Sequence, residues 1–441
     1  MKTSNRWLSI FTGILCLAFL SPAAAQDAPP TGPGVSSFGS LLSHDPEDAA
    51  IQLRTIQQRA TGADALFPNP PFQTFRERVV ATQQRLYDVR HIKTGLALNS
   101  AFQGLSDALP GEEKFGAASD MDLIVAWELI NRGQPTRGRI YCGLEGRWEY
   151  GIPGPSDLGP ASLGSSIETA NSYAAYSPTY IVRNLFWRQG SPEAGWGYRI
   201  GHITPEQVFS TSSRLSPIST FLTVAGTRPY ANALSDSGLG AVVGWAPFDR
   251  VRIGGIVSDA NANRLQWALG SGEVYKALEI QAKLWPKTET GVWSKITFWH
   301  NDGNSDGQPI NGMTGREGWG VFVIHEHELT ADGRAVAILR WGKCSNRSAL
   351  FEEQVGVHLV LDDPCVPFVR HLEDDAWGVA FNWVDSSAAG SRDEYDLEAF
   401  YRFPLFPNTD LSFLYQSIFR PALERSIDHA SAISIRLASS Y

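Results

Sequence analysis

The chain has 441 residues, of which 43% are hydrophobic, 11% aromatic and 19% charged, and its formal net charge is -9. The 46 acidic residues outnumber the 37 basic ones, which excludes the extended basic surface that nucleic-acid binding requires. The high aromatic content and the low charge exclude a disordered chain, and the mean hydropathy of -0.17 lies in the range of water-soluble proteins.

The first 25 residues have the pattern of an export signal. Lys2 and Arg6 precede an apolar run from Trp7 to Leu20, and small residues follow up to Ala25. A basic region, an apolar region and a small-residue site in this order predict a signal peptide that is cleaved after Ala25. An uncleaved membrane anchor is the alternative, but the apolar run is shorter than the about 20 residues that a spanning helix needs.

A short helical segment is predicted before the main domain. Residues 26–45 are rich in Pro, Gly and Ser and predict a flexible leader. Two helical patterns follow at 45–60 and 72–87, and a Pro-rich stretch at 67–71 separates them. The second pattern has only a thin apolar stripe, so we expect a surface helix without a core of its own. The predicted order is a signal peptide (1–25), a leader with helices (26–90) and a β-domain (91–441).

From about Ile92 onward, apolar and polar residues alternate with a period of two, which predicts β-strands with two different faces. The clearest case is 139–150, where Arg139, Glu145, Arg147 and Glu149 share the polar face. The same split occurs at 275–284, 293–299 and 394–403. The polar faces of these three segments carry Glu279, Lys283, Lys295, Glu398 and Arg402.

Two architectures have such strands, a soluble β-sandwich and an outer-membrane β-barrel. Segments of about ten residues, aromatic residues near segment ends and an alternation that continues up to Tyr441 favour the barrel. Sixteen strands of about ten residues would leave connections of about 13 residues and would enclose an aqueous channel. We therefore predict an all-β, transmembrane antiparallel up-and-down barrel of about 16 strands in the outer membrane. A soluble periplasmic sugar-binding sandwich is the alternative.

Several short stretches follow one another between about residue 95 and the end of the chain: DLIVAWEL (122–129), LEGRWEYG (144–151), LFWRQ (185–189), YRIGHITP (198–205), SGLGA (237–241), SDAN (258–261), GWG (318–320) and EAFYRFPL (398–405). In this order they resemble the carbohydrate-selective porins of the OprB family of Gram-negative bacteria. The resemblance implies a sixteen-stranded barrel that passes sugars by facilitated diffusion and that is not an enzyme. Arg340 lies in a partly kept family signature at 340–343. A channel for polysaccharide export or a barrel enzyme is the alternative function.

The pore-lining candidates for sugar binding are the polar-face residues named above together with Arg340 and Trp187. Each charged side chain has two possible roles: it exchanges hydrogen bonds with sugar hydroxyls, or it only balances a neighbouring charge across strands. Trp187 and Arg188 lie on opposite faces of one strand. Because the apolar face of a sugar stacks on aromatic rings, Trp187 is the preferred candidate for the lumen, and a position at the membrane interface is the alternative. The net acidity favours neutral mono- or oligosaccharides over anionic solutes.

The expected partners are a carbohydrate solute, the lipid and lipopolysaccharide of the outer membrane, and the barrel-assembly machinery, which would read the terminal Tyr441. We expect no cofactor and no nucleic-acid partner, and the barrel is expected to be a monomer or a homo-oligomer.

Two weaker patterns concern calcium and disulfides. Asp302, Asn304 and Asp306 copy the first half of a calcium loop, but Met313 stands where the bidentate Glu should be, and an ordinary turn is the alternative. After export three cysteines remain, so at most one disulfide forms. Cys344 and Cys365 lie in turn-rich stretches and are the candidate pair for it.

Overall fold

The computed structural model describes residues 65–67, 73–173, 179–212, 214–262, 272–284, 292–304, 314–363 and 375–441. The predicted signal peptide, the leader and the predicted helix at 45–60 lie outside these residues, as do Asp306 and Cys365.

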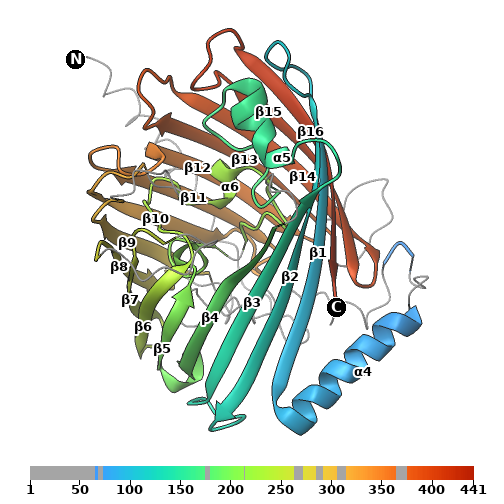
Figure 1. Cartoon of the computed structure of the whole chain (residues 1–441), viewed down its shortest axis with the longest axis vertical. Helices are drawn as coiled ribbons and strands as arrows, with labels where there is room; N and C mark the ends of the chain where they lie inside the picture. Colours follow the sequence, from blue (N-terminus) through green and yellow to red (C-terminus); the bar gives the residue numbers. More distant parts are fainter. Residues whose placement is uncertain are drawn as a thin grey trace. The chain divides into compact units, whose positions relative to one another are not determined.

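The described residues form sixteen strands that close into one barrel, in which each strand pairs with the next and β1 pairs with β16 (Figure 1). All of these pairings are antiparallel. The predicted all-β fold is therefore confirmed, and the alternative of a soluble sandwich is wrong. The strands are β1 (Ile92–Leu105), β2 (Phe115–Ile130), β3 (Gly138–Glu149), β4 (Thr179–Ser191), β5 (Trp196–Ile203), β6 (Gly238–Phe248), β7 (Val251–Asp259), β8 (Val274–Ala282), β9 (Ser294–Asn301), β10 (Gly318–Glu328), β11 (Ala335–Cys344), β12 (Phe351–Asp362), β13 (Ala376–Ser386), β14 (Glu394–Phe406), β15 (Thr409–Phe419) and β16 (His429–Ser440).

The outer surface of the barrel is apolar. Along the strands, exposed apolar residues alternate with buried ones, as the period of two predicts. Exposed members of this outer band include Leu98, Phe102, Ile200, Val243, Trp245, Phe298, Trp319, Phe381, Leu397, Phe413, Ile433, Ile435 and Leu437. Such a band on a closed barrel is the surface that faces lipid in the outer membrane.

The last strand closes the barrel against the first. Ala97 to Leu105 on β1 pair with Ser440 to Ala432 on β16. One step further, the backbone N–H and C=O of Tyr441 exchange two hydrogen bonds of 2.8 Å with Leu96. The terminal residue therefore takes part in the closure, which leaves residues 92–95 of β1 paired with β2 alone.

The connections show which end of the barrel faces the periplasm. Connections of two residues, 249–250 and 407–408, join β6 to β7 and β14 to β15 at one end. The long connections that follow β3 and β5 start from the other end. Outer-membrane barrels have short turns on the periplasmic side. Since the strand number is even, β1 also begins and β16 also ends at this periplasmic end.

The predicted helix at 72–87 is present as α4 (Gln73–Arg90), and it lies outside the ring of strands beside the beginning of β1 (Figure 1). The Nε2 of Gln83 donates a 3.2 Å hydrogen bond to the carbonyl of Thr94, and the rings of Phe75 and Tyr441 meet edge to face at 5.9 Å. Among the described residues, no helix combines the length and the apolar character that crossing a bilayer would require.

The other helices are short and belong to connections. They are α5 (Pro155–Asp157), the π-helical turn η1 (Leu158–Leu163), and the 3-10 turns η2 (Pro192–Ala194) and η3 (Pro205–Gln207), followed by α6 (Val224–Thr227).

Candidate functional site

The interior of the barrel contains the connection between β5 and β6, which we call the inner segment (204–237). It includes η3 and α6, and α6 lies against the inner faces of β12 and β13 (Figure 1). Thr223 caps α6, because its hydroxyl accepts a hydrogen bond from the N–H of Gly226. The carboxylate of Glu398 on β14 accepts hydrogen bonds from the N–H groups of Leu222 and Thr223 and from the Thr223 hydroxyl.

Five further charged side chains, from β8, β9, β11, β14 and β16, hold the inner segment along its length. Their contacts are Glu279 with Ser210 N (2.7 Å), Lys295 with Thr211 O (2.5 Å), Arg340 with Ala225 O (3.0 Å), Arg402 with Ser219 O (3.3 Å) and Arg436 with Pro217 O (2.7 Å). Five predicted pore-lining residues therefore face the interior, and each of them forms a hydrogen bond with the inner segment. They are Glu279, Lys295, Arg340, Glu398 and Arg402. For these residues the contacts favour an anchoring role over solute binding.

An apolar cluster attaches the inner segment to one half of the wall. Phe221 packs edge to face against Phe400 at 5.0 Å, and Leu222, Val224 and Ala225 are buried beside it. The wall contributes inward apolar residues from β10 to β14, including Phe322, Ile324, Val336, Ile338, Val360 and Val384. The inner face of these strands is therefore apolar in part, because protein covers this part of the wall, although Arg340, Glu398 and Arg402 lie on the same face.

A second connection, 150–173, is also held by inward side chains. Glu394 accepts hydrogen bonds from the N–H and hydroxyl of Ser166, both at 2.8 Å, and Glu149 accepts one of 2.6 Å from the N–H of Gly154. The Nε2 of Gln416 donates to the carbonyl of Thr169 at 2.8 Å. The predicted candidate Glu149 thus lies on the expected face and fixes the start of this connection.

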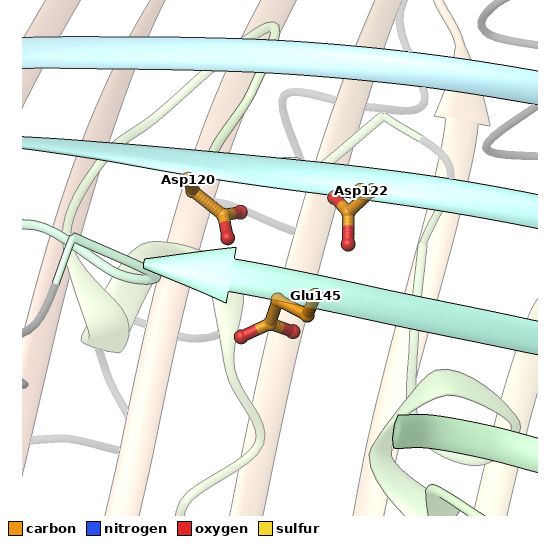
Figure 2. A group of neighbouring side chains, drawn as sticks. All are labelled: Asp120, Asp122 and Glu145. Atoms are coloured by element: carbon orange, nitrogen blue, oxygen red, sulfur yellow. The ribbon is translucent and has the colours of Figure 1, made fainter. Parts of the chain in front are cut away.

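Opposite the apolar half, β2 and β3 carry a group of charges that point into the barrel. The register places Asp120 beside Arg147 and Asp122 beside Glu145. Carboxylate oxygens of Asp120, Asp122 and Glu145 all lie within 4.8 Å of one another (Figure 2). The Nε of Arg147 forms ion pairs with Glu145 and, at 3.7 Å, with Asp120. The predicted inward face of β3 is therefore observed, and it meets acidic residues of β2.

Arg183 extends this group across the barrel. Its guanidinium pairs with Glu145 at 2.8 Å and with Glu206 of η3 at 2.5 Å, and Arg228 pairs with the other oxygen of Glu206. A β-bulge turns Arg183 inward: Gly143 pairs with Asn184 but Leu144 pairs with Val182, so Arg183 is the extra residue. The charged row therefore runs from β2 through β3 and β4 to the inner segment.

Two inward polar side chains in or beside this row have no hydrogen-bond partner among the described residues. Asp122 is half-buried and has no hydrogen-bond or ion-pair partner among the described residues. Asn99 is 1% exposed, lies directly opposite Asp120 on the same inner face, and neither of its amide atoms has a hydrogen-bond partner in the described part of the chain. Two guanidinium groups already neutralise two of the three clustered carboxylates. This favours neutral hydroxyl groups over a metal ion as the ligand.

A row of arginines lies nearer the periplasmic end of the same wall. Arg139, Arg188 and Arg199 are direct neighbours across β3, β4 and β5, and all three are buried on the inner face. Beside them Tyr141 and Phe186 stack at 4.9 Å, and the guanidinium of Arg199 lies 5.7 Å from the centre of the Phe186 ring. All three guanidinium groups lie on the inner face, so they form a stripe of positive charge on this wall, with Glu128 of β2 opposite Arg139 at its edge.

Two predicted pore-lining residues lie elsewhere. The prediction for Trp187 is wrong: it pairs with Ile140 and Ile200 on the outward face, and Arg188 points inward instead. The alternation had placed the two residues on opposite faces without deciding which faced the lumen. Lys283 lies beyond the end of β8 in the periplasmic connection, with its Nζ 5.3 Å from the ring of Trp293.

The described residues of the calcium and disulfide patterns make other contacts in the structure. Asp302 accepts hydrogen bonds from the N–H of Val274 and the ammonium of Lys276, at 3.0 and 3.1 Å, which favours the ordinary turn over a calcium loop. Cys344 is a free, buried thiol whose Sγ donates to the carbonyl of Phe351 at 3.6 Å. The predicted bridge is not formed at Cys344, and Cys365 lies outside the described residues.

Several residues of the charged row were not among the candidates predicted from the sequence. They are Asn99, Asp120, Asp122, Arg183, Glu206 and Arg228. Asp120 and Asp122 alternate with Met121 and Leu123, so the same period of two that identified β3 would have identified them.

No family model matches this sequence, and no curated protein is similar enough to match it. Solved structures do match. The high-pH structure of OprB from Pseudomonas putida has a TM-score of 0.64 at 14% identity, and the match covers 82% of this chain and 97% of that one. The low-pH structure of the same protein gives 0.50 at 12% identity, covering 82% and 96%. An anion-selective porin from Comamonas acidovorans gives 0.48 at 10% identity, covering 79% and 99%.

At such identities the comparison concerns the fold. The number of strands, the antiparallel closure and the apolar outer band all agree with it. The chain is therefore a sixteen-stranded outer-membrane β-barrel with the fold of the porin OprB.

Proposed function

We propose that this barrel is a porin that lets neutral mono- or oligosaccharides diffuse passively across the outer membrane into the periplasm. The observation that carries the proposal is the charged row on β2, β3 and β4, with the unpartnered side chains of Asn99 and Asp122 beside it. The sequence resemblance to carbohydrate-selective porins supports the same substrate class.

The row has the chemistry that a polyol needs. Carboxylates accept hydrogen bonds from sugar hydroxyls, guanidinium groups donate to them, and an amide does both. Positive and negative charges lie close together in the row, because Arg147 and Arg183 lie among Asp120, Asp122 and Glu145. A solute that offers several hydroxyl groups could replace part of the water along this row, whereas a small ion gains from only one sign of charge.

Because the inner segment is anchored, it forms a fixed surface opposite the charged row. Glu206 of the inner segment pairs with Arg183 of the wall, and Arg228 of the same segment pairs with Glu206. The apolar cluster holds the rest of the segment against β10 to β14, on the other half of the barrel. A solute that passes the segment on its polar side would therefore meet the charged row.

Liposome swelling with the purified protein tests the proposal. We expect neutral sugars to enter faster than ions of similar size. Asp122→Asn combined with Asn99→Ala should slow sugar entry about fivefold, which corresponds to the about 1 kcal/mol of one hydrogen bond. Lys343→Gln, which removes an outward-facing charge, serves as the control and should leave sugar entry unchanged. Equal entry of sugars and ions into liposomes with the unaltered protein would contradict the selectivity.

Heat-modifiable gel migration separates a transport effect from a folding effect. The double variant should migrate as a folded barrel without heating and as an unfolded chain after heating, like the unaltered protein. A barrel that folds but passes sugars at the unaltered rate would remove Asn99 and Asp122 from the proposed path.

A further inference from the structure

Helix α4 is the one long helix of the described residues, and the transport proposal gives it no role. It lies outside the barrel at the periplasmic end, against the part of β1 that β16 does not cover. Gln83 contacts the backbone of Thr94 there, and the ammonium of Lys93 lies 5.1 Å from the centre of the Tyr87 ring. None of its residues is buried, so one face touches the barrel and the rest of its surface is open.

One open face of α4 combines apolar and basic side chains. Phe75, Arg78, Thr82, Arg85 and Val89 follow each other at steps of three or four residues, so they share one side of the helix. Phe75 is 56% exposed and Val89 is 62% exposed. Neither Arg78 nor Arg85 has an acidic partner among the described residues. We call this side the Arg78/Arg85 face.

This face continues the lipid-facing surface of the barrel. The ring of Phe75 contacts that of Tyr441, which directly follows β16, and Ile433, Ile435 and Leu437 of β16 belong to the apolar outer band. A helix outside the wall at this height meets the boundary between acyl chains and headgroups. Apolar side chains enter that boundary, while arginines reach from it to phosphate groups.

We propose that the Arg78/Arg85 face of α4 lies on the periplasmic leaflet and binds the phosphate groups of anionic phospholipids. Phe75 and Val89 enter the apolar edge of the leaflet, and the two guanidinium groups pair with headgroups. The helix carries four arginines against two acidic residues, so its charge is complementary to an anionic surface. This inference needs only the barrel fold and is independent of the solute that the barrel passes.

Hydrogen–deuterium exchange of the full-length protein in vesicles tests this inference. We compare vesicles of phosphatidylcholine alone with vesicles that also contain phosphatidylglycerol. The amides of α4 should exchange about tenfold more slowly when phosphatidylglycerol is present, since each arginine near an anionic surface adds to the attraction. High salt should remove this difference because it screens the surface charge. The exchange of strand amides should be the same in both kinds of vesicle.

Two double variants on the same helix separate lipid binding from packing on the barrel. Arg78→Gln with Arg85→Gln should abolish the effect of phosphatidylglycerol. Glu77→Gln with Asp88→Asn removes two charges from the opposite side and should preserve it; the hydrogen bonds that these acids receive from Gln73 and Gln84 remain possible with an amide. Equal exchange of α4 in both kinds of vesicle, or equal loss of the effect in both double variants, would overturn the proposal.

Discussion

Glu398, on the inner face of β14, holds Thr223 of the inner segment: one carboxylate oxygen accepts hydrogen bonds from both the N–H of Thr223, at 3.1 Å, and its hydroxyl, at 2.9 Å. The two residues are 175 positions apart in the chain and both are fully buried. A carboxylate in front of the first turn of α6 fixes the inner segment by hydrogen bonds as well as by packing.

Glu398→Gln should loosen this attachment. A neutral amide accepts weaker hydrogen bonds than a carboxylate, and its NH₂ group would face other donors, so we expect a loss of about 2 kcal/mol in the free energy of unfolding. The looser inner segment should also increase the fluctuations of single-channel current. Glu353→Gln, on the outward face of β12, is the control. If the variant has the same free energy of unfolding and the same current fluctuations as the unaltered protein, packing alone holds the segment.

Phe221→Ala tests the apolar part of the same attachment. Phe221 is fully buried between His358 and Phe400, so its loss should leave a cavity and lower the free energy of unfolding by about 3 to 5 kcal/mol. Denaturant unfolding followed by Trp fluorescence measures the loss. Phe381→Ala removes a ring of the same size from the lipid-facing side of β13 and is the matched comparison, with a smaller expected loss. Similar losses for both variants would contradict a packed interior.

Arg147→Ala should change transport without preventing assembly. The substitution removes the ion-pair partner that Glu145 and Asp120 share, so the charged row becomes more negative and offers one donor fewer to a solute. We expect sugar flux to fall several-fold and the permeability ratio to shift toward cations. Liposome swelling gives the flux, and the reversal potential in a salt gradient gives the ratio. If neither changes, Arg147 serves only to balance its neighbours.

Arg188→Gln should shift the ion selectivity of the pore more than its sugar flux. Arg188 is the middle residue of the arginine row, and its neutralisation weakens the positive stripe on β3, β4 and β5. The reversal potential should move toward that of a cation-selective pore. The neighbouring Trp187→Phe, on the outward face, should leave both quantities unchanged. A change in sugar flux for Trp187→Phe would restore Trp187 as a lumen residue.

Much of the fold could be predicted from the sequence, because the side chains of a strand alternate between two different environments. The charged face of β3 and the strands around Glu279 and Glu398 follow directly from that alternation. The closing strand, with Ile433, Ile435 and Leu437 outward and Arg436 inward, follows from it as well.

The parts that could not be predicted depend on contacts between distant residues. The inner segment has no periodic pattern, and its position depends on partners such as Glu279 and Arg436 that come later in the chain. Because it covers the wall, Phe322 and Ile338 are apolar on a face that was expected to be polar. The bulge at Arg183 breaks the alternation, so the period of two gives the wrong face for one of the residues beside it.

The anchored inner segment also has a consequence for the order of assembly. Its residue Pro217 contacts Arg436, 219 positions later and on the last strand. The segment is translated before β6 to β16, so its contact with Arg436 can form only after β16 has taken its place in the sheet. The inner segment therefore reaches its final position no earlier than the last strand does.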